Sequence, residues 1–531
     1  MVASDRWGLA SPRAAMTGGS GPTDRPSDGA PAPGAGASAL ITRRSVLAGA
    51  AVAAGSAAAG GAVGWWAADK SSSRRSSPYQ RRVDVVVVGG GIAGLTAARN
   101  LVKAGRSVVV LEALSRVGGR MVRRSVAEGG WVDLGGQWAG PTQHRLLALS
   151  DELGLKRFPS YYGGEGIVAF DGIAGRFKGD ISTVRGLPGQ RSPAPAGAVH
   201  DAERGTAALA TLARSVSPGQ PWTAPRATAL DRQTVADWLQ RNVRTGFGRF
   251  VIANEGVFNS SGGTLDEVSL LHLLFEMRAN PHGERPDSDL YFGGAGQIPL
   301  ILARQLGDRV AVKAAVRAIS QDSSGVTVTT AAGRFRAGHV IVAIPPTLAG
   351  AISYDPPLPA RRLQLGQRMP LGTLAKVHAV YPTAFWRPLG LSGSAVGTLP
   401  TVQATADSSP PDGKPGILTG FVAGQGALSW ATRPWAQRRQ TVLADYRTYF
   451  GSRASSPVDY VEAVWPANPF AGGAFNAFMP PGVWTGYGPA LRAPIGRIHW
   501  VGAETATRWY GYFDGAISSA EREVGAILGK T

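Results

Sequence analysis

The sequence predicts an α/β fold of the Rossmann type, whose first unit is a strand, a helix and a second strand. A run of valines within residues 83–88 ends at a cluster of glycines, and a second apolar run ends at Glu112. Gly89, Gly91 and Gly94 occupy the G-x-G-x-x-G positions between the two runs. Such glycines permit a tight turn, close approach to a pyrophosphate and close helix packing, and the acid accepts ribose hydroxyls. The unit therefore predicts an adenine dinucleotide at a helix N-terminus.

Length and composition set the broad class. At 531 residues the chain exceeds a single small core, so two packed domains are expected. The net charge of +19 comes from scattered Lys and Arg, without a basic helix, a zinc spacing or an RNP-like strand, so we predict no nucleic-acid partner. The chain has no cysteine, which excludes a disulfide, a thiolate metal site and a cofactor linked through Cys.

The N-terminal part carries a predicted export signal. Residues 1–41 are rich in Gly, Pro, Ala and Ser and are expected to form a disordered leader. Residues 42–70 begin TRRSVL and continue as a weakly hydrophobic, alanine-rich stretch, which is typical of a twin-arginine signal. The twin-arginine export machinery is thus an expected partner and export the expected fate; a membrane span, or retention at the membrane by an uncleaved signal, is the alternative. Residues 71–80 indicate a linker.

Further motifs follow Glu112 in a fixed order. ALSRVGGR ends at Arg120, VDLGGQW ends at Trp138, and RMPLGTLAK ends at Lys376. Together with the glycine pattern these motifs resemble the flavin-containing amine oxidase family. The stretch GPTQHRLLALSDELGL is similar to the monoamine oxidase branch of that family. The resemblance covers residues 80–531 and is specific for the family rather than for a substrate.

The resemblance implies a discontinuous Rossmann-type FAD-binding domain, of the kind found in glutathione reductase, interleaved with an α+β substrate-binding domain. The FAD-binding domain is expected over residues 81–160, 287–350 and 466–531. The substrate-binding domain is expected over residues 161–286 and 351–465. Within the latter, apolar spacing predicts one helix that begins at Asp231 or Thr234 and another that begins near Thr264.

The implied cofactor is FAD. Arg120 follows two glycines and can reach a phosphate, unless it is an ordinary surface arginine. Gly135 and Gly136 let backbone pass flat against a planar ring, while the resemblance assigns Val316 to the adenine and Glu504 to the ribityl chain. The full set of predicted FAD-binding residues is Gly89, Gly91, Ala93, Gly94, Glu112, Ala113, Arg120, Gly135, Gly136, Gln137, Trp138, Val316, Glu504, Gly511, Tyr512 and Phe513.

Three residues are predicted to act in catalysis. Lys376 lies mid-strand, where alternation puts it on one side with Leu374 and His378, and an inward lysine needs a polar partner or a function. The family's lysine at this position holds a water against flavin N5; an edge-strand lysine is the alternative. Phe475 and Tyr512 match the family's aromatic cage, although Tyr512 could also be a core aromatic. Many relatives carry a flavin-linking cysteine where this chain has Ala474, so non-covalent FAD is expected.

The resemblance therefore implies FAD-dependent oxidative deamination of a small amine, with a primary amine as the expected substrate and O₂ reduced to H₂O₂. An L-amino-acid oxidase is the nearest alternative, but that group carries an arginine where this chain has Trp138. A flavin dehydrogenase or desaturase and a non-catalytic flavoprotein are further alternatives. The loop from His282 to Asp289 has metal-type residues but loop spacing, so no metal is expected. The assembly stays open, with a homodimer among the alternatives.

Overall fold

The computed structural model describes residues 80–258, 261–280 and 287–529. The leader, the twin-arginine segment and residues 71–79 of the predicted linker lie outside the described residues, as do His282 and Glu284. Gln80, the last residue of that predicted linker, instead begins β1. None of the helices in the described ranges has the length and apolarity that a membrane crossing requires.

The first sheet contains the predicted strand–helix–strand unit and has the order β10-β2-β1-β13-β12-β11-β14, with β20 paired to β13. β1 runs parallel to both β2 and β13, whereas β12 is antiparallel to both of its neighbours. Its strands are β1 (Gln80–Val88), β2 (Val108–Leu111), β10 (Val310–Ala311), β11 (Val316–Asp322), β12 (Gly325–Thr330), β13 (Gly333–Val342), β14 (Ser353–Asp355) and β20 (Ile498–Trp500).

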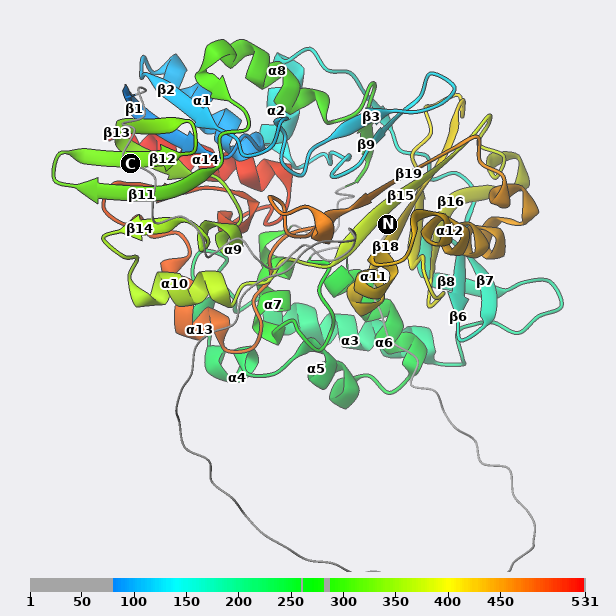
Figure 1. Cartoon of the computed structure of the whole chain (residues 1–531). Helices are drawn as coiled ribbons and strands as arrows, with labels where there is room; N and C mark the ends of the chain where they lie inside the picture. The colour runs from blue at the N-terminus through cyan, green and yellow to red at the C-terminus, as the bar shows by residue number, and fades with distance from the viewer. Residues whose placement is uncertain (1–79, 259–260, 281–286, 530–531) are drawn as a thin grey trace, which may run out of the picture. The chain divides into compact units, whose positions relative to one another are not determined.

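The parallel centre of this sheet is covered on one face by α1 (Ile92–Lys103), α8 (Gln297–Leu306) and α14 (Phe513–Ile527), with α1 and α14 side by side (Figure 1). Val85 and Val87 pack under these helices, and Val86 packs on the other face in a cluster with Val340 and Trp500. Because both faces of β1 are covered, its valines form a continuous apolar run rather than an alternating one. Val85, Val86 and Val87 are all at most 1% exposed. The predicted α/β class is confirmed.

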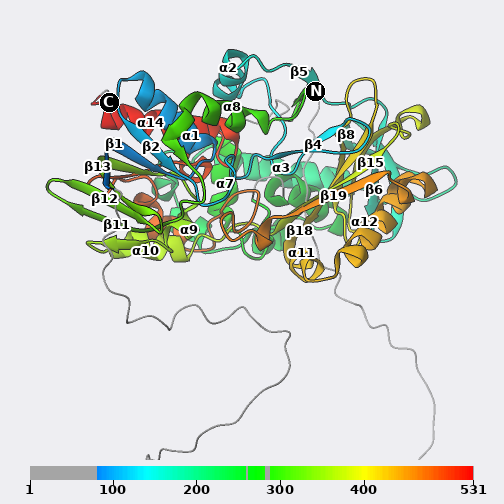
Figure 2. The same ribbon diagram turned by 45° about the horizontal axis from the view of Figure 1, so that its top comes forward.

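The second sheet has the order β19-β15-β18-β17-β16-β6-β7-β8 and is antiparallel except where β16 pairs with β6. Figure 2 shows this sheet beside the helix α12. Its strands are β6 (Glu165–Phe170), β7 (Ile173–Lys178), β8 (Asp180–Gly186), β15 (Leu374–Tyr381), β16 (Leu391–Gly397), β17 (Ala404–Asp407), β18 (Gly416–Ala423) and β19 (Asp459–Val464). Two short pairs complete the strands, β3 (Arg123–Ser125) with β4 (Trp131–Asp133) and β5 (Arg157–Pro159) with β9 (Asp289–Tyr291).

Helices gather mainly in the segment between β8 and β9, where α3 packs on α6 and α7. The remaining helices of the described ranges are α2 (His144–Glu152), α3 (Ala198–Ala213), α4 (Ala227–Asp231), α5 (Val235–Asn242), α6 (Gly246–Ala253), α7 (Leu270–Ala279), α9 (Pro346–Ala349), α10 (Ala360–Gln367), α11 (Gly424–Ala431), α12 (Trp435–Phe450) and α13 (Val483–Tyr487).

Hydrogen bonds at the helix starts explain one correct and one wrong prediction. α5 begins directly after Thr234, as expected, because Thr234 and Asp237 form a capping box with bonds of 3.1 and 3.2 Å. α7 was expected to begin near Thr264 but begins at Leu270. The hydroxyl of Ser269 accepts the His272 amide at 3.1 Å and caps this helix. Thr264 instead begins a separate turn, in which its carbonyl oxygen accepts the Glu267 and Val268 amides at 3.1 and 3.2 Å.

The described residues belong to one compact unit by their contacts. The first sheet lies within the three segments assigned to FAD binding except for Gln80, the first residue of β1, and for β14, which falls just beyond residue 350. The second sheet lies entirely within the two segments assigned to the substrate. The domain boundaries themselves stay a prediction.

Candidate active site

One cavity passes from the turn after β1 to the aromatic side chains of the second sheet. Its walls come from both sheets and from the segment around α14. Of the predicted site residues, Gly94 does not line the cavity and packs behind it. The predicted residues that line it are Gly89, Gly91, Ala93, Glu112, Ala113, Arg120, Gly135, Gly136, Gln137, Trp138, Val316, Lys376, Phe475, Glu504, Gly511, Tyr512 and Phe513.

The turn between β1 and α1 has the shape that a pyrophosphate needs. Gly89 has a φ of +104°, which favours glycine, and a Cβ on Gly91 would meet nothing within 4 Å, so that face is open. A Cβ on Gly94 would lie 2.1 Å from the carbonyl oxygen of Gly89, so the helix can pack on the turn only with glycine there. Gly91 caps α1 without a side chain, which leaves backbone N–H groups for phosphate oxygens.

Glu112 is fixed at the end of β2 by two backbone amides. Its Oε2 accepts the Gly90 N–H at 2.7 Å and its Oε1 accepts the Leu114 N–H at 2.8 Å. The carboxylate is 6% exposed and stands in the cavity wall, where its remaining lone pairs can accept ribose hydroxyls. Val316 lines the same end together with Leu114 and Ile352. This end of the cavity fits the adenosine half of FAD.

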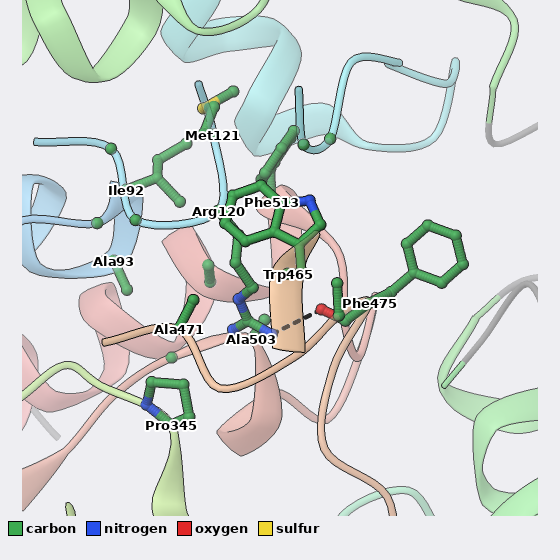
Figure 3. A pocket seen from close by; sticks show the side chains of 18 of the residues that line it. Ile92, Ala93, Arg120, Met121, Pro345, Trp465, Ala471, Phe475, Ala503 and Phe513 are labelled. Carbon is green, nitrogen blue, oxygen red and sulfur yellow. Dashed lines mark hydrogen bonds between the residues drawn. The ribbon is translucent and has the colours of Figure 1, made fainter. Parts of the chain in front are cut away.

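Arg120 joins two segments from the C-terminal part of the chain. Its Nη1 donates to the carbonyl oxygen of Phe475 at 2.7 Å (Figure 3). Its Nη2 donates to Glu504 Oε2 at 3.0 Å. The ring of Phe475 points away from the guanidinium. The sequence motifs assigned Arg120 and Glu504 to different parts of FAD and did not reveal their ion pair. Both residues line the cavity, so the pair forms part of its wall.

Lys376 lies on β15 and is 2% exposed. Its Nζ donates to the carbonyl oxygens of Asp133 and Gly135, at 2.9 and 2.8 Å, and to Gln137 Oε1. Burial lowers the pKa of Lys376 to about 7, although the carboxylates of Asp133 and Asp287 act in the opposite direction. The lysine is therefore an inward residue with polar partners that can change its charge near neutral pH.

Asp133 is a buried acid that the motif analysis did not single out. It accepts the Ala295 and Gly296 backbone N–H groups at 2.8 and 2.9 Å, and so anchors the chain that enters α8. Burial raises the pKa of Asp133 to about 6, while those two amides and the charge of Lys376 lower it. The sequence shows that Asp133 lies two residues before Gly135, but it does not show that Asp133 binds the backbone that enters α8.

Aromatic residues surround the other end of the cavity. The ring centroid of Phe421 is 5.9 Å from that of Phe475 and 6.2 Å from that of Trp138. Phe421 is paired directly opposite Lys376 in the sheet, and the sequence analysis missed it because its strand carries no motif. Trp509 and Tyr510 are core residues at 1% exposure, whereas Tyr512 lines the cavity.

The charged residues of the lining limit the substrates that can bind. Among the described lining residues the cations are Arg120 and Lys376, and both already contact oxygen atoms of the chain. The acids are Glu112, Asp287 and Glu504. No further cation of the described lining is available to pair with a substrate carboxylate. Within the described ranges, no group of three or more His, Asp or Glu side chains could hold a metal ion.

Comparisons with known proteins agree with this geometry. The family model described as flavin containing amine oxidoreductase matches residues 92–528. A protein named L-amino acid dehydrogenase, from Synechocystis, is 43% identical over 83% of this chain and 93% of its own. The putative flavin-containing monoamine oxidase AofH of Mycobacterium tuberculosis is 41% identical over 82% of this chain and 95% of its own. A solved putrescine oxidase bound to putrescine has a TM-score of 0.78 and 33% identity, covering 85% of this chain and 100% of that one.

Proposed function

Because the chain belongs to the flavin-containing amine oxidoreductase family, we propose that it deaminates a primary amine with O₂ as the electron acceptor. It is a flavin amine oxidoreductase, and its cofactor is non-covalent FAD. The observation that supports this proposal most strongly is the cavity that runs from Glu112 to Phe475 and Tyr512. Its products would be an imine, hydrolysed to an aldehyde and ammonia, and H₂O₂.

In this reaction FAD supplies the acceptor for the α-hydrogen and two electrons of the amine. The chain supplies the surroundings. Phe475 and Tyr512 would enclose the neutral amine, exclude water and favour positive charge that develops on nitrogen. Lys376 would hold or accept a proton at Nζ, since its lowered pKa lets the neutral form exist near pH 7. The N-terminus of α14 adds a positive dipole end near the residues that line the cavity.

A second candidate is an L-amino acid dehydrogenase, because a relative of that name has extensive similarity to this chain. A substrate with an α-carboxylate would need a cation beside the aromatic end. The described lining offers Arg120 and Lys376, which are already engaged, together with the acid Asp287. The charge balance therefore favours an amine without a carboxylate.

Anaerobic mixing of the purified holoprotein with primary amines and with the corresponding L-amino acids separates the candidates. We expect the amines to bleach the flavin absorbance at ~450 nm and the amino acids to bleach it far more slowly. Admission of air should then restore the colour and produce H₂O₂. Bleaching by amino acids alone would favour the second candidate, and a flavin that stays bleached after air is admitted would indicate another acceptor than O₂.

Export by the twin-arginine route belongs to the same proposal, supported by the TRRSVL sequence and the alanine-rich stretch after it. Replacement of Arg43 and Arg44 by Lys is expected to leave the protein in the cytoplasm, because the signal is recognised through that arginine pair. Fractionation of cells that express the parent and the variant measures this. Replacement of Arg13 and Arg25 by Lys, two leader arginines outside the motif, is the control. Undiminished export of the Arg43/Arg44 variant would contradict the assignment.

A further inference from the structure

A row of buried polar side chains leads from α13 to the aromatic end of the cavity. The indole N–H of Trp484 donates to His272 Nδ1 at 3.2 Å. Because Nδ1 accepts this bond, the proton of a neutral His272 must sit on Nε2. That nitrogen lies 3.4 Å from Glu276 Oε1, one turn further along α7. The amide Nδ2 of Asn476 donates to the same oxygen at 3.4 Å.

This row of side chains ends at Asn476, between the two residues predicted to form the aromatic cage, Phe475 and Tyr512. Asn476 directly follows Phe475, and its side chain packs against Gly511, which directly precedes Tyr512. A Cβ on Gly511 would lie 2.6 Å from Asn476 Nδ2, so the contact is close enough to require glycine. The Asn476 amide is therefore the link between the segment that carries Phe475 and the segment that carries Tyr512.

A contribution to stability does not explain why a carboxylate is buried at Glu276. Glu276 is 3% exposed and Asn476 is fully buried. Among the described residues, Glu276 Oε2, Asn476 Oδ1 and His272 Nε2 have no hydrogen-bond partner. A buried acid held by two long contacts is costly, and an apolar side chain would pack there at lower cost. The contacts that it does make lead toward the cage.

We infer that Glu276 is a positioning residue for amine oxidation: it holds the Asn476 amide between Phe475 and Gly511 and thereby fixes the separation of the two aromatic walls. The His272 ring lies on the other side of the carboxylate, with Nε2 3.4 Å from Oε1. This inference rests on the proposed function, because it concerns the space in which Phe475 and Tyr512 would enclose the amine. Glu276 itself does not line the cavity and acts through Asn476.

The test compares Glu276→Gln with Glu276→Leu in the holoprotein, by the rate of anaerobic flavin reduction at saturating amine. Gln retains an oxygen that can accept from Asn476, so we expect a rate within about threefold of the parent. Leu removes the acceptor, and a shift of the cage by a fraction of an ångström should lower the rate by roughly 10- to 100-fold. FAD content and reduction by dithionite should stay at parent levels in both variants.

Asp201→Asn is the matched control for a general loss of packing. Asp201 is also a buried acid of the helical segment, at 5% exposure, but its carboxylate serves Thr245 and Arg204 and has no hydrogen bond to Trp484, His272, Glu276 or Asn476. We expect this variant to melt at a lower temperature and to reduce its flavin at the parent rate. A parent rate in Glu276→Leu would overturn the inference, as would equal losses in Gln, Leu and the Asp201 variant. A parent protein whose flavin no amine reduces would overturn the proposed function and this inference together.

Discussion

Replacement of Lys376 by Met is expected to leave FAD bound and to slow flavin reduction or reoxidation by roughly 10²- to 10⁴-fold. Lys376 is a buried amine in the cavity wall, and Met has a similar length but cannot hold or accept a proton. Many other lining residues would hold FAD, so its binding should persist. The two half-reactions are measured separately, by anaerobic mixing with amine and by mixing the reduced protein with O₂. The control is Lys103→Met, which changes an exposed lysine on α1.

The pH dependence gives a second signature of Lys376. Its pKa is lowered from 10.5 to about 7, so the protonated fraction falls as pH rises from 6 to 8. If Lys376 acts in its neutral form, the rate at saturating substrate rises through this pH range and becomes constant above it. Lys376→Met should lose this inflection. Rates in the variant equal to those of the parent at every pH would remove Lys376 from the mechanism.

Replacement of Gly94 by Ala is expected to lower FAD affinity by roughly 10- to 100-fold. The added Cβ would overlap the carbonyl oxygen of Gly89 at 2.1 Å, and backbone cannot swing aside as a side chain can. Either α1 or the glycine turn must move, at a cost of about 1–3 kcal/mol, which corresponds to that loss of affinity. FAD release during dialysis and titration of the apoprotein with FAD measure the effect.

Gly525→Ala is the control for this prediction, because it adds the same methyl group to another helix. Gly525 lies in α14, and a Cβ there would meet nothing within 4 Å. Alanine also favours a helix over glycine by about 0.8–1 kcal/mol. This variant should bind FAD as the parent does and unfold at the same or a higher temperature. Normal FAD affinity in Gly94→Ala would show that the turn tolerates displacement.

The sequence sufficed for features whose geometry is set by nearby residues. The β1–α1–β2 unit could be predicted because its glycines, its valines and Glu112 lie within one short stretch. The Arg120–Glu504 bond joins residues 384 positions apart, and no local pattern encodes it. Phe421 escaped notice for a related reason, since only the register of β15 and β18 places it opposite Lys376. The start of α7 was missed because Thr264 and Ser269 are both good caps and tertiary contacts decide between them.

The ion pair of Arg120 and Glu504 also has a consequence for biosynthesis. The wall that it forms needs Phe475, Glu504 and the residues that lead into α14, which are made long after the glycine turn. α14 then has to pack beside α1, which directly follows that turn. A nascent chain can therefore form the glycine turn early but cannot close the cavity until these later residues have been made. FAD can be enclosed only after α14 has been synthesised.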